Sequence, residues 1–168
     1  MISSERLDLV VLGLDGFRAV AAGRLDAVSE LLGAAAPAEL ADAVPAALRV
    51  EQLERDPLEA PWLARALVLR DEERIVGAAG FHGPPDACGR AEIGYQVFAP
   101  DRRRGFAREA VVALLDWAAR QGGVRVFVAS ISPENAASQR LVTSLGFERV
   151  GAQIDPVDGL EWVYERPA

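Results

Sequence analysis

The stretch Arg102-Arg103-Arg104-Gly105-Phe106-Ala107 is the most informative part of this 168-residue sequence. A strand-like run (93–98) precedes it, and a helix-like run (107–120) follows it. The first amides of a helix have no intrahelical partner, and the helix dipole adds about half a positive charge there. Three arginines add cations suited to phosphate, and Gly105 lets the backbone bend and a ligand approach closely. The stretch therefore predicts a phosphate-binding loop that opens a helix.

Strand and helix patterns surround this loop. Residues 124–131 follow a strand–helix unit, so we expect them to lie parallel to 91–98 through a right-handed crossover. The earlier strands follow one another through turns and predict an antiparallel meander. Strands are expected at 6–12, 63–70, 74–82, 91–98, 124–131, 147–152 and 160–166, and helices at 14–22, 25–32, within 38–55 with a break at Pro45, and at 107–120.

A further helix is expected to start at Ser132-Pro133-Glu134. Serine is a good N-cap, proline suits the first helical position, and glutamate is favoured near the positive end of the helix. Leu141 and Leu145 predict its buried stripe, and Gly146 suits its C-terminal end.

Composition limits the classes of function. The chain is 51% hydrophobic, which is enough for one domain with a real core, so we expect a single domain over residues 1–168. The net charge of -7 argues against general nucleic-acid binding, which needs a basic face. One cysteine (Cys88) excludes internal disulfides, and one cysteine with one histidine (His82) argues against a zinc site.

No targeting or membrane segment is evident. Charged residues from Glu5 to Asp8 interrupt any apolar leader, and no apolar run approaches the length that crosses a bilayer. We therefore expect a cytoplasmic protein without a membrane partner.

The motifs resemble the GNAT N-acetyltransferase superfamily, and within it the ribosomal-protein-alanine acetyltransferase-like branch. That family carries a Gln/Arg-x-x-Gly-x-Gly/Ala loop, which here reads Arg102-x-x-Gly105-x-Ala107. The resemblance implies an α/β (α+β) fold of the GNAT acyl-CoA N-acyltransferase type, with a mixed, mostly antiparallel central sheet and helices on both faces. It implies an N-terminal helical part at about 13–60 and an acetyl-CoA-binding part at about 91–147. The matching residues are 92–97, Pro100, 102–107, Glu109-Ala110, 133–138, Leu141 and 145–147.

The resemblance implies acetyl-CoA as co-substrate and no metal. The amides of residues 103–107 would hold the CoA pyrophosphate at the helix N-terminus. Val97 and Phe98 would offer strand-edge groups to the pantetheine arm, and the Val97 amide would polarise the thioester carbonyl. Asn135 and Ser138, one helical turn apart, would hydrogen-bond the CoA arm. The implied cofactor-binding residues are Val97, Phe98, Arg102, Arg103, Arg104, Gly105, Phe106, Ala107, Asn135 and Ser138.

Glu92 is the candidate catalytic base, because a carboxylate on the strand leading to the loop can take the ammonium proton directly or through water. Strand alternation puts Glu92 on one face with Gly94 and Gln96. The alternative is a solvated or salt-bridged strand glutamate.

Family members often carry a tyrosine acid where this chain has Val142, so Ser138 or water is left to protonate the leaving thiolate. His82 either lines an acceptor pocket or is structural.

The sequence thus predicts an acetyl-CoA-dependent N-acetyltransferase acting by direct attack in a ternary complex. The acceptor is a primary amine, either a small molecule or a protein N-terminus. The chain is expected to be a monomer or homodimer. The first alternative is a non-catalytic acyl-CoA-binding or sensing module. The second is nucleic-acid binding through the arginine loop, which the net charge disfavours.

Overall fold

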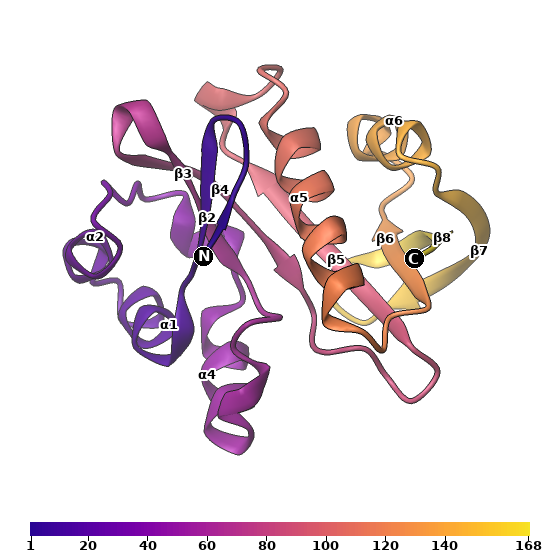
Figure 1. The fold of residues 1–168 in the computed structure, drawn as a ribbon, viewed down its shortest axis with the longest axis horizontal. Helices are drawn as coiled ribbons and strands as arrows, with labels where there is room; N and C mark the ends of the chain where they lie inside the picture. The colour runs from indigo at the N-terminus through magenta and orange to yellow at the C-terminus, as the bar shows by residue number, and fades with distance from the viewer. The chain divides into compact units, whose positions relative to one another are not determined.

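The computed structural model describes all 168 residues, which form two compact units (Figure 1). Unit 1 comprises Met1–Pro84 and Gly94–Leu114, and unit 2 comprises Pro85–Ile93 and Leu115–Ala168. Strand β5 (Arg90–Val97) and helix α5 (Phe106–Gln121) each contribute one half to either unit.

Unit 1 contains an antiparallel meander. Its strands follow the order β1-β2-β3-β4, and the C-terminal half of β5 continues the series next to β4. A short helical turn joins β3 to β4 and ends at Glu73, whose φ of 47° reverses the chain. The meander was predicted, whereas the two-residue strand β1 was not. The bounds are β1 Ile2–Ser3, β2 Leu7–Val11, β3 Arg65–Leu69 and β4 Arg74–Phe81.

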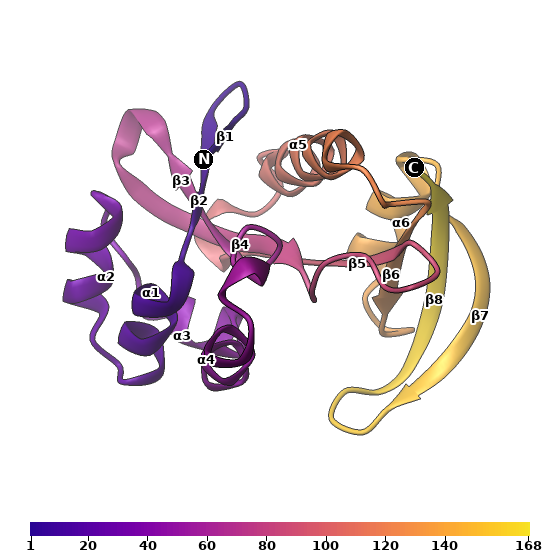
Figure 2. The ribbon, with the colours of Figure 1, turned by 60° about the horizontal axis from the view of Figure 1, so that its bottom comes forward.

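Helices cover both faces of this meander (Figure 2). Helices α1 to α4 lie on one side, where Phe17, Val28 and Leu40 pack against Ala66 and Ile75 of the sheet. The first half of α5 lies on the other side. Because both faces are covered, all five residues of β3 are buried. The helices are α1 Gly13–Ala21, α2 Leu25–Leu32, α3 Leu40–Ala43 and α4 Ala46–Arg55, with the predicted break at Pro45.

Unit 2 contains a smaller mixed sheet. The N-terminal half of β5 pairs in parallel with β6, with Glu92 opposite Val128, which confirms the predicted parallel pairing. Strand β8 lies between β6 and β7 and is antiparallel to both, so the order is β5-β6-β8-β7. The bounds are β6 Val126–Ile131, α6 Ala136–Ser144, β7 Glu148–Asp155 and β8 Gly159–Pro167.

The start of α6 corrects the sequence-based prediction. The helix begins at Ala136 and is capped by Asn135, not by Ser132. The Asn135 amide donates to the Ser132 carbonyl at 3.0 Å, so Ser132-Pro133-Glu134 forms a turn ahead of the helix. Both residues are good caps, and the closed turn places the second one at the helix end.

The buried stripe of α6 also differs from the prediction. Val142 is fully buried, whereas Leu141 and Leu145 are only half-buried. The helix therefore turns position 142 toward the protein interior. The fold class itself is confirmed, since the chain forms a mixed, mostly antiparallel sheet of eight strands with helices. None of the helices combines the length and the apolar character that would be needed to cross a membrane.

Candidate functional site

The arginine-rich loop joins β5 to α5, as the sequence predicted. After Val97 the chain passes through a short helical turn (Ala99–Asp101) and reaches α5 at Phe106. The first bond of the helix runs from the Glu109 amide to the Gly105 carbonyl, at 3.1 Å. The N-cap position is thus held by glycine, which has no side chain to accept from the first amides of α5. The first amides of a helix have no intrahelical partner, so a helix that begins in this way can bind an anion at its N-terminus.

The loop turns through two residues of positive φ. Arg103 has a φ of 63° and Gly105 a φ of 86°. Glycine adopts this region without steric cost, whereas a residue with a Cβ is disfavoured there. A Cβ added to Gly105 would also lie 3.4 Å from Nη2 of Arg6. The glycine is therefore required by backbone conformation, and Arg6 limits the space beside it.

The three arginines of the loop point to different partners. Arg104 donates through Nη1 to Oδ1 of Asp101 at 2.8 Å. Arg102 donates through Nε to the Val97 carbonyl at 3.0 Å. Arg103 makes no ion pair, and its side chain is exposed. Of the three guanidinium groups, that of Arg103 is the one left for a ligand without breaking an internal bond.

Asp101 is a buried carboxylate at the base of the loop. Its side chain is only 3% exposed, and Arg74 binds it in a bidentate manner at 2.6 and 2.8 Å. The hydrogen bonds from Arg74, with a further one from Arg104, hold the pKa of Asp101 below its usual range. Asp101 therefore stays ionised at neutral pH and links the start of β4 to the loop.

Glu109 forms a second buried carboxylate centre, in the first turn of α5. Its side chain is 12% exposed and accepts hydrogen bonds from Ser4 Oγ at 2.7 Å and from the Leu7 amide at 3.2 Å. Arg6 contributes its amide at 2.6 Å and Nε at 2.8 Å, and Nη2 lies 2.7 Å from Oε2. Burial raises the pKa of Glu109, but these hydrogen bonds outweigh burial and lower it overall.

The ring of Phe106, the first residue of α5, is in contact with the guanidinium groups of two arginines. The Cζ atoms of Arg6 and Arg104 lie 4.5 and 4.8 Å from its ring centroid, and the residue is 1% exposed. Arg6 also donates through Nη1 to the Arg104 carbonyl at 3.0 Å. Arg6 therefore contacts both the backbone of the loop and the aromatic ring beneath it.

Val97 and Phe98, predicted to offer backbone groups to an added ligand strand, are already partly engaged. The Phe98 amide donates to the Val76 carbonyl at 2.9 Å, and the Phe98 carbonyl accepts from the Asp101 amide at 2.9 Å. The Val97 carbonyl accepts from Arg102. A ligand hydrogen bond to either carbonyl would have to be a second one, which a carbonyl oxygen can accept.

Glu92, Asn135 and Ser138 belong to unit 2, whereas the loop, Val97 and Phe98 belong to unit 1. Glu92 is half-buried on β5. Asn135 accepts from the Ser138 amide at 3.0 Å through Oδ1, so the two residues predicted on one helix face meet as a helix cap.

His82 follows the end of β4. Its carbonyl accepts from Arg49 Nη1 at 2.8 Å and from Gln52 Nε2 at 3.2 Å, both on α4. Its Nε2 lies close to Gly94, where an added Cβ would come within 3.2 Å of it. The backbone of His82 is therefore held by the N-terminal helices, and its ring lies against β5.

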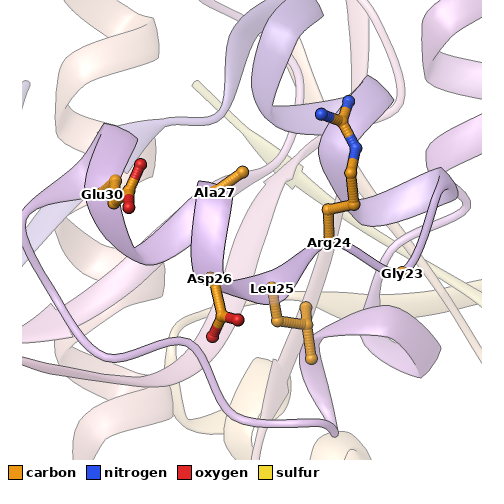
Figure 3. Close-up of a pocket in the computed structure, with 6 residues that line it drawn as sticks. All are labelled: Gly23, Arg24, Leu25, Asp26, Ala27 and Glu30. Carbon is orange, nitrogen blue, oxygen red and sulfur yellow. The ribbon is translucent and has the colours of Figure 1, made fainter.

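A surface hollow of about 580 Å³ lies elsewhere, where α1 leads into α2 (Figure 3). None of the predicted site residues lines it. No group of three or more histidine, cysteine, aspartate or glutamate side chains is placed to hold a metal ion. The residues around the hollow are Gly23, Arg24, Leu25, Asp26, Ala27 and Glu30.

Sequence reasoning missed Ser4, Arg6, Arg74 and Asp101, which surround the loop. Arg6 and Asp101 are separated by most of unit 1 in sequence, so no local spacing links them. A signal was available only for Asp101, which directly precedes the arginines and so could pair with one of them.

A known protein family matches most of this chain. Residues 18–148 match the family model described as Acetyltransferase (GNAT) domain. The uncharacterized N-acetyltransferase YjdG of Bacillus subtilis (strain 168) is 37% identical over 81 residues, which are 48% of this chain and 48% of that protein. The match thus spans about half the length of that relative.

Solved structures share the fold at low identity. The ribosomal-protein-S5-alanine acetyltransferase of Vibrio fischeri has a TM-score of 0.59 and 18% identity, covering 71% of this chain and 67% of its own. The microcin C7 self immunity acetyltransferase MccE, solved with acetyl-CoA and AMP, has a TM-score of 0.65 and 16% identity, covering 98% and 93%. Because the family model covers more than three quarters of its residues, this chain belongs to the GNAT acetyltransferase family.

Proposed function

We propose that this protein is an acetyl-CoA-dependent N-acetyltransferase that acetylates a primary amine by direct attack in a ternary complex. The observation that carries the proposal is the glycine-capped N-terminus of α5, which follows a strand and carries an exposed arginine at position 103. Membership of the GNAT family supports the same donor.

The loop fits the pyrophosphate of CoA. Gly105 removes both the side chain and the cap that would compete with an anion for the first amides of α5. Arg103 supplies an unpaired cation, and the amides of residues 103–107 supply hydrogen-bond donors. Arg102 and Arg104 contribute their backbone, because their guanidinium groups are bound within the protein. When bound, acetyl-CoA supplies the activated acyl group.

The proposed chemistry forms a C–N bond and breaks a C–S bond. Glu92 accepts the proton of the acceptor ammonium, directly or through water, and the neutral amine attacks the thioester carbon. The amide of Val97 stabilises the negative charge that develops on the carbonyl oxygen. The thiolate that leaves takes a proton from Ser138 or from water, and this donor is restored by the second proton that the attacking nitrogen loses as the amide forms. Val142 cannot supply this proton, since it is aliphatic and fully buried.

The acceptor is a small amine or a protein N-terminus. The net charge of -7 favours cationic acceptors through long-range attraction. A neighbour in fold, the Vibrio fischeri enzyme, is named for transfer to alanine of a ribosomal protein, which supports testing protein N-termini. We place the reaction in the cytoplasm.

The test is an acetyl-transfer screen over peptides, polyamines, amino acids and aminoglycosides, read out by thiol release. Glu92→Gln keeps the shape of the side chain and removes its basicity. The variant should lose turnover on the order of 100-fold or more, while acetyl-CoA binding measured by calorimetry stays the same. Wild-type turnover in the variant would refute the assignment of Glu92 as base.

A second candidate function, a non-catalytic acyl-CoA-binding module, is favoured by one observation. The position where family members often have a tyrosine acid holds the buried Val142. This candidate predicts tight acetyl-CoA binding without thiol release for any amine. Thiol release that depends on an amine would exclude it.

A further inference from the structure

We propose that Asp101 and Glu109 are positioning residues that hold the loop of residues 102–107 in the conformation that binds the donor's pyrophosphate. The inference rests on the proposed function, because it assumes that the loop binds acetyl-CoA. Neither residue touches the donor in this proposal. Asp101 acts through Arg104 of the loop, and Glu109 acts through Arg6, which contacts the loop.

Asp101 holds the loop from its N-terminal side. Its buried carboxylate is anchored to β4 by the bidentate pair with Arg74, whose Nε also lies 2.6 Å from Oε2 of Glu72. Oδ1 of Asp101 also accepts a hydrogen bond from Nη1 of Arg104 at 2.8 Å. The side chain of Arg104 is thereby directed back to the base of the loop. Because the guanidinium of Arg104 is already paired with Asp101, Arg104 offers a ligand its backbone amide and not its side chain.

Glu109 holds the loop from its C-terminal side, through Arg6. The carboxylate of Glu109 receives the amide, Nε and Nη2 of Arg6, which sets the plane of the guanidinium. The remaining nitrogen of Arg6, Nη1, then donates to the carbonyl of Arg104 at 3.0 Å. Fixing this carbonyl fixes the peptide that joins Arg104 to Gly105, whose amide belongs to the predicted anion site.

The need for such support follows from the loop's own conformation. Arg103 and Gly105 both adopt positive φ, so the loop has no regular ladder of hydrogen bonds to hold it. A flexible loop would lose conformational freedom when it binds the donor, and this loss would weaken affinity. Two buried carboxylates that hold the loop before binding remove that cost. Positioning groups of this kind should therefore increase the affinity for a donor that carries the pyrophosphate.

The experiment compares two donors. S-acetylpantetheine carries the thioester and the pantetheine arm but lacks the pyrophosphate, so it should not use the loop. In Asp101→Asn and Glu109→Gln, kcat/KM for acetyl-CoA should fall on the order of 10- to 100-fold, mainly through KM. For S-acetylpantetheine, kcat/KM should change by less than about threefold. A purely structural defect would lower kcat/KM by the same factor for both donors.

Asp8→Asn is the matched control. Asp8 also accepts from a serine, Ser3, and from an arginine, Arg70, at 2.8 and 3.0 Å, but this pair does not touch the loop. The control should keep the wild-type ratio between the two donors. If the amide variants fail to fold, Arg6→Lys offers the same test, since lysine keeps the charge but cannot bridge Glu109 and the Arg104 carbonyl in one plane.

The outcomes separate the two levels of the proposal. Variants that fold and keep the wild-type preference for acetyl-CoA would overturn the positioning role while leaving the donor assignment intact. A wild-type protein that uses both donors equally well, or transfers from neither, would overturn the donor assignment and this inference together.

Discussion

Two junctions in this chain lead from a strand through a short turn into a helix, but the two helices begin differently. At the first, β5 leads to α5, and glycine occupies the N-cap position. At the second, β6 leads to α6, and the N-cap is Asn135, whose Oδ1 accepts from the Ser138 amide at 3.0 Å. The asparagine satisfies the helix end internally. The glycine leaves the first amides of α5 to an external acceptor.

The comparison teaches that an open helix end needs support from elsewhere. The α6 end is stabilised by its own cap and by the turn that precedes it. The α5 end is held by the carboxylates of Asp101 and Glu109 and by Arg6, which directly precedes β2. The carboxylates hold the arginines, while the amides remain open.

Among changes at the two helix ends, substitution of Gly105 should have the largest effect on acetyl-CoA affinity. Gly105→Ala places a Cβ at a φ of 86° and 3.4 Å from Arg6 Nη2. A left-handed conformation costs an L-residue about 1–2 kcal/mol, so acetyl-CoA affinity should fall roughly tenfold as the loop relaxes away from this conformation. Calorimetric titration with acetyl-CoA measures the effect.

Gly146→Ala is the control for that variant. Gly146 follows α6 with a φ of 85° and has nothing within 4 Å of an added Cβ. It should lose stability for the same backbone reason and bind acetyl-CoA like the wild type. Equal losses of affinity in both variants would mean that Gly105 matters for folding only.

A smaller effect is expected from removing the cap of α6. Asn135→Ala should cost about 1 kcal/mol of stability, because the Ser138 amide loses its acceptor. For a chain of this size that lowers the melting temperature by roughly 2–4 °C. Asn135→Asp keeps the oxygen acceptor and should melt like the wild type. A drop in acetyl-CoA affinity in Asn135→Ala beyond that caused by destabilisation would support the predicted contact with the CoA arm.

The smallest expected effect is on the pH dependence of folding stability, and it should appear only in acid. The folded pKa of Asp101 and of Glu109 lies below the unfolded values of about 3.9 and 4.3. Their stabilisation is therefore fully present above those values and is lost as pH falls through the folded pKa. Urea unfolding between about pH 6 and pH 3 should show a steeper loss for the wild type than for Asp101→Asn. Parallel curves would mean that the Asp101 network does not stabilise the fold.

Most elements were predictable because their signals are local. Helix α5 and the break at Pro45 depend on periodicity and on one missing amide, and both are confirmed. The predicted start of α6 was wrong because two good caps, Ser132 and Asn135, lie three residues apart. Only the turn between them determines which one begins the helix. The burial of Val142 could not be predicted, since it depends on how the helix is rotated against its neighbours.

The candidate site divides along the same line. The loop of residues 102–107, its position between strand and helix, and the family were determined by the sequence alone, because glycine, arginine and helix-end chemistry act over a few residues. The structure was needed to show which arginine side chain stays unpaired and which are bound within the protein. The bonds from Arg104 to Asp101 and from Arg102 to the Val97 carbonyl are local, whereas Arg6 and Arg74 reach the loop and Asp101 from distant parts of the chain. Pairing over such distances has no local signature in the sequence.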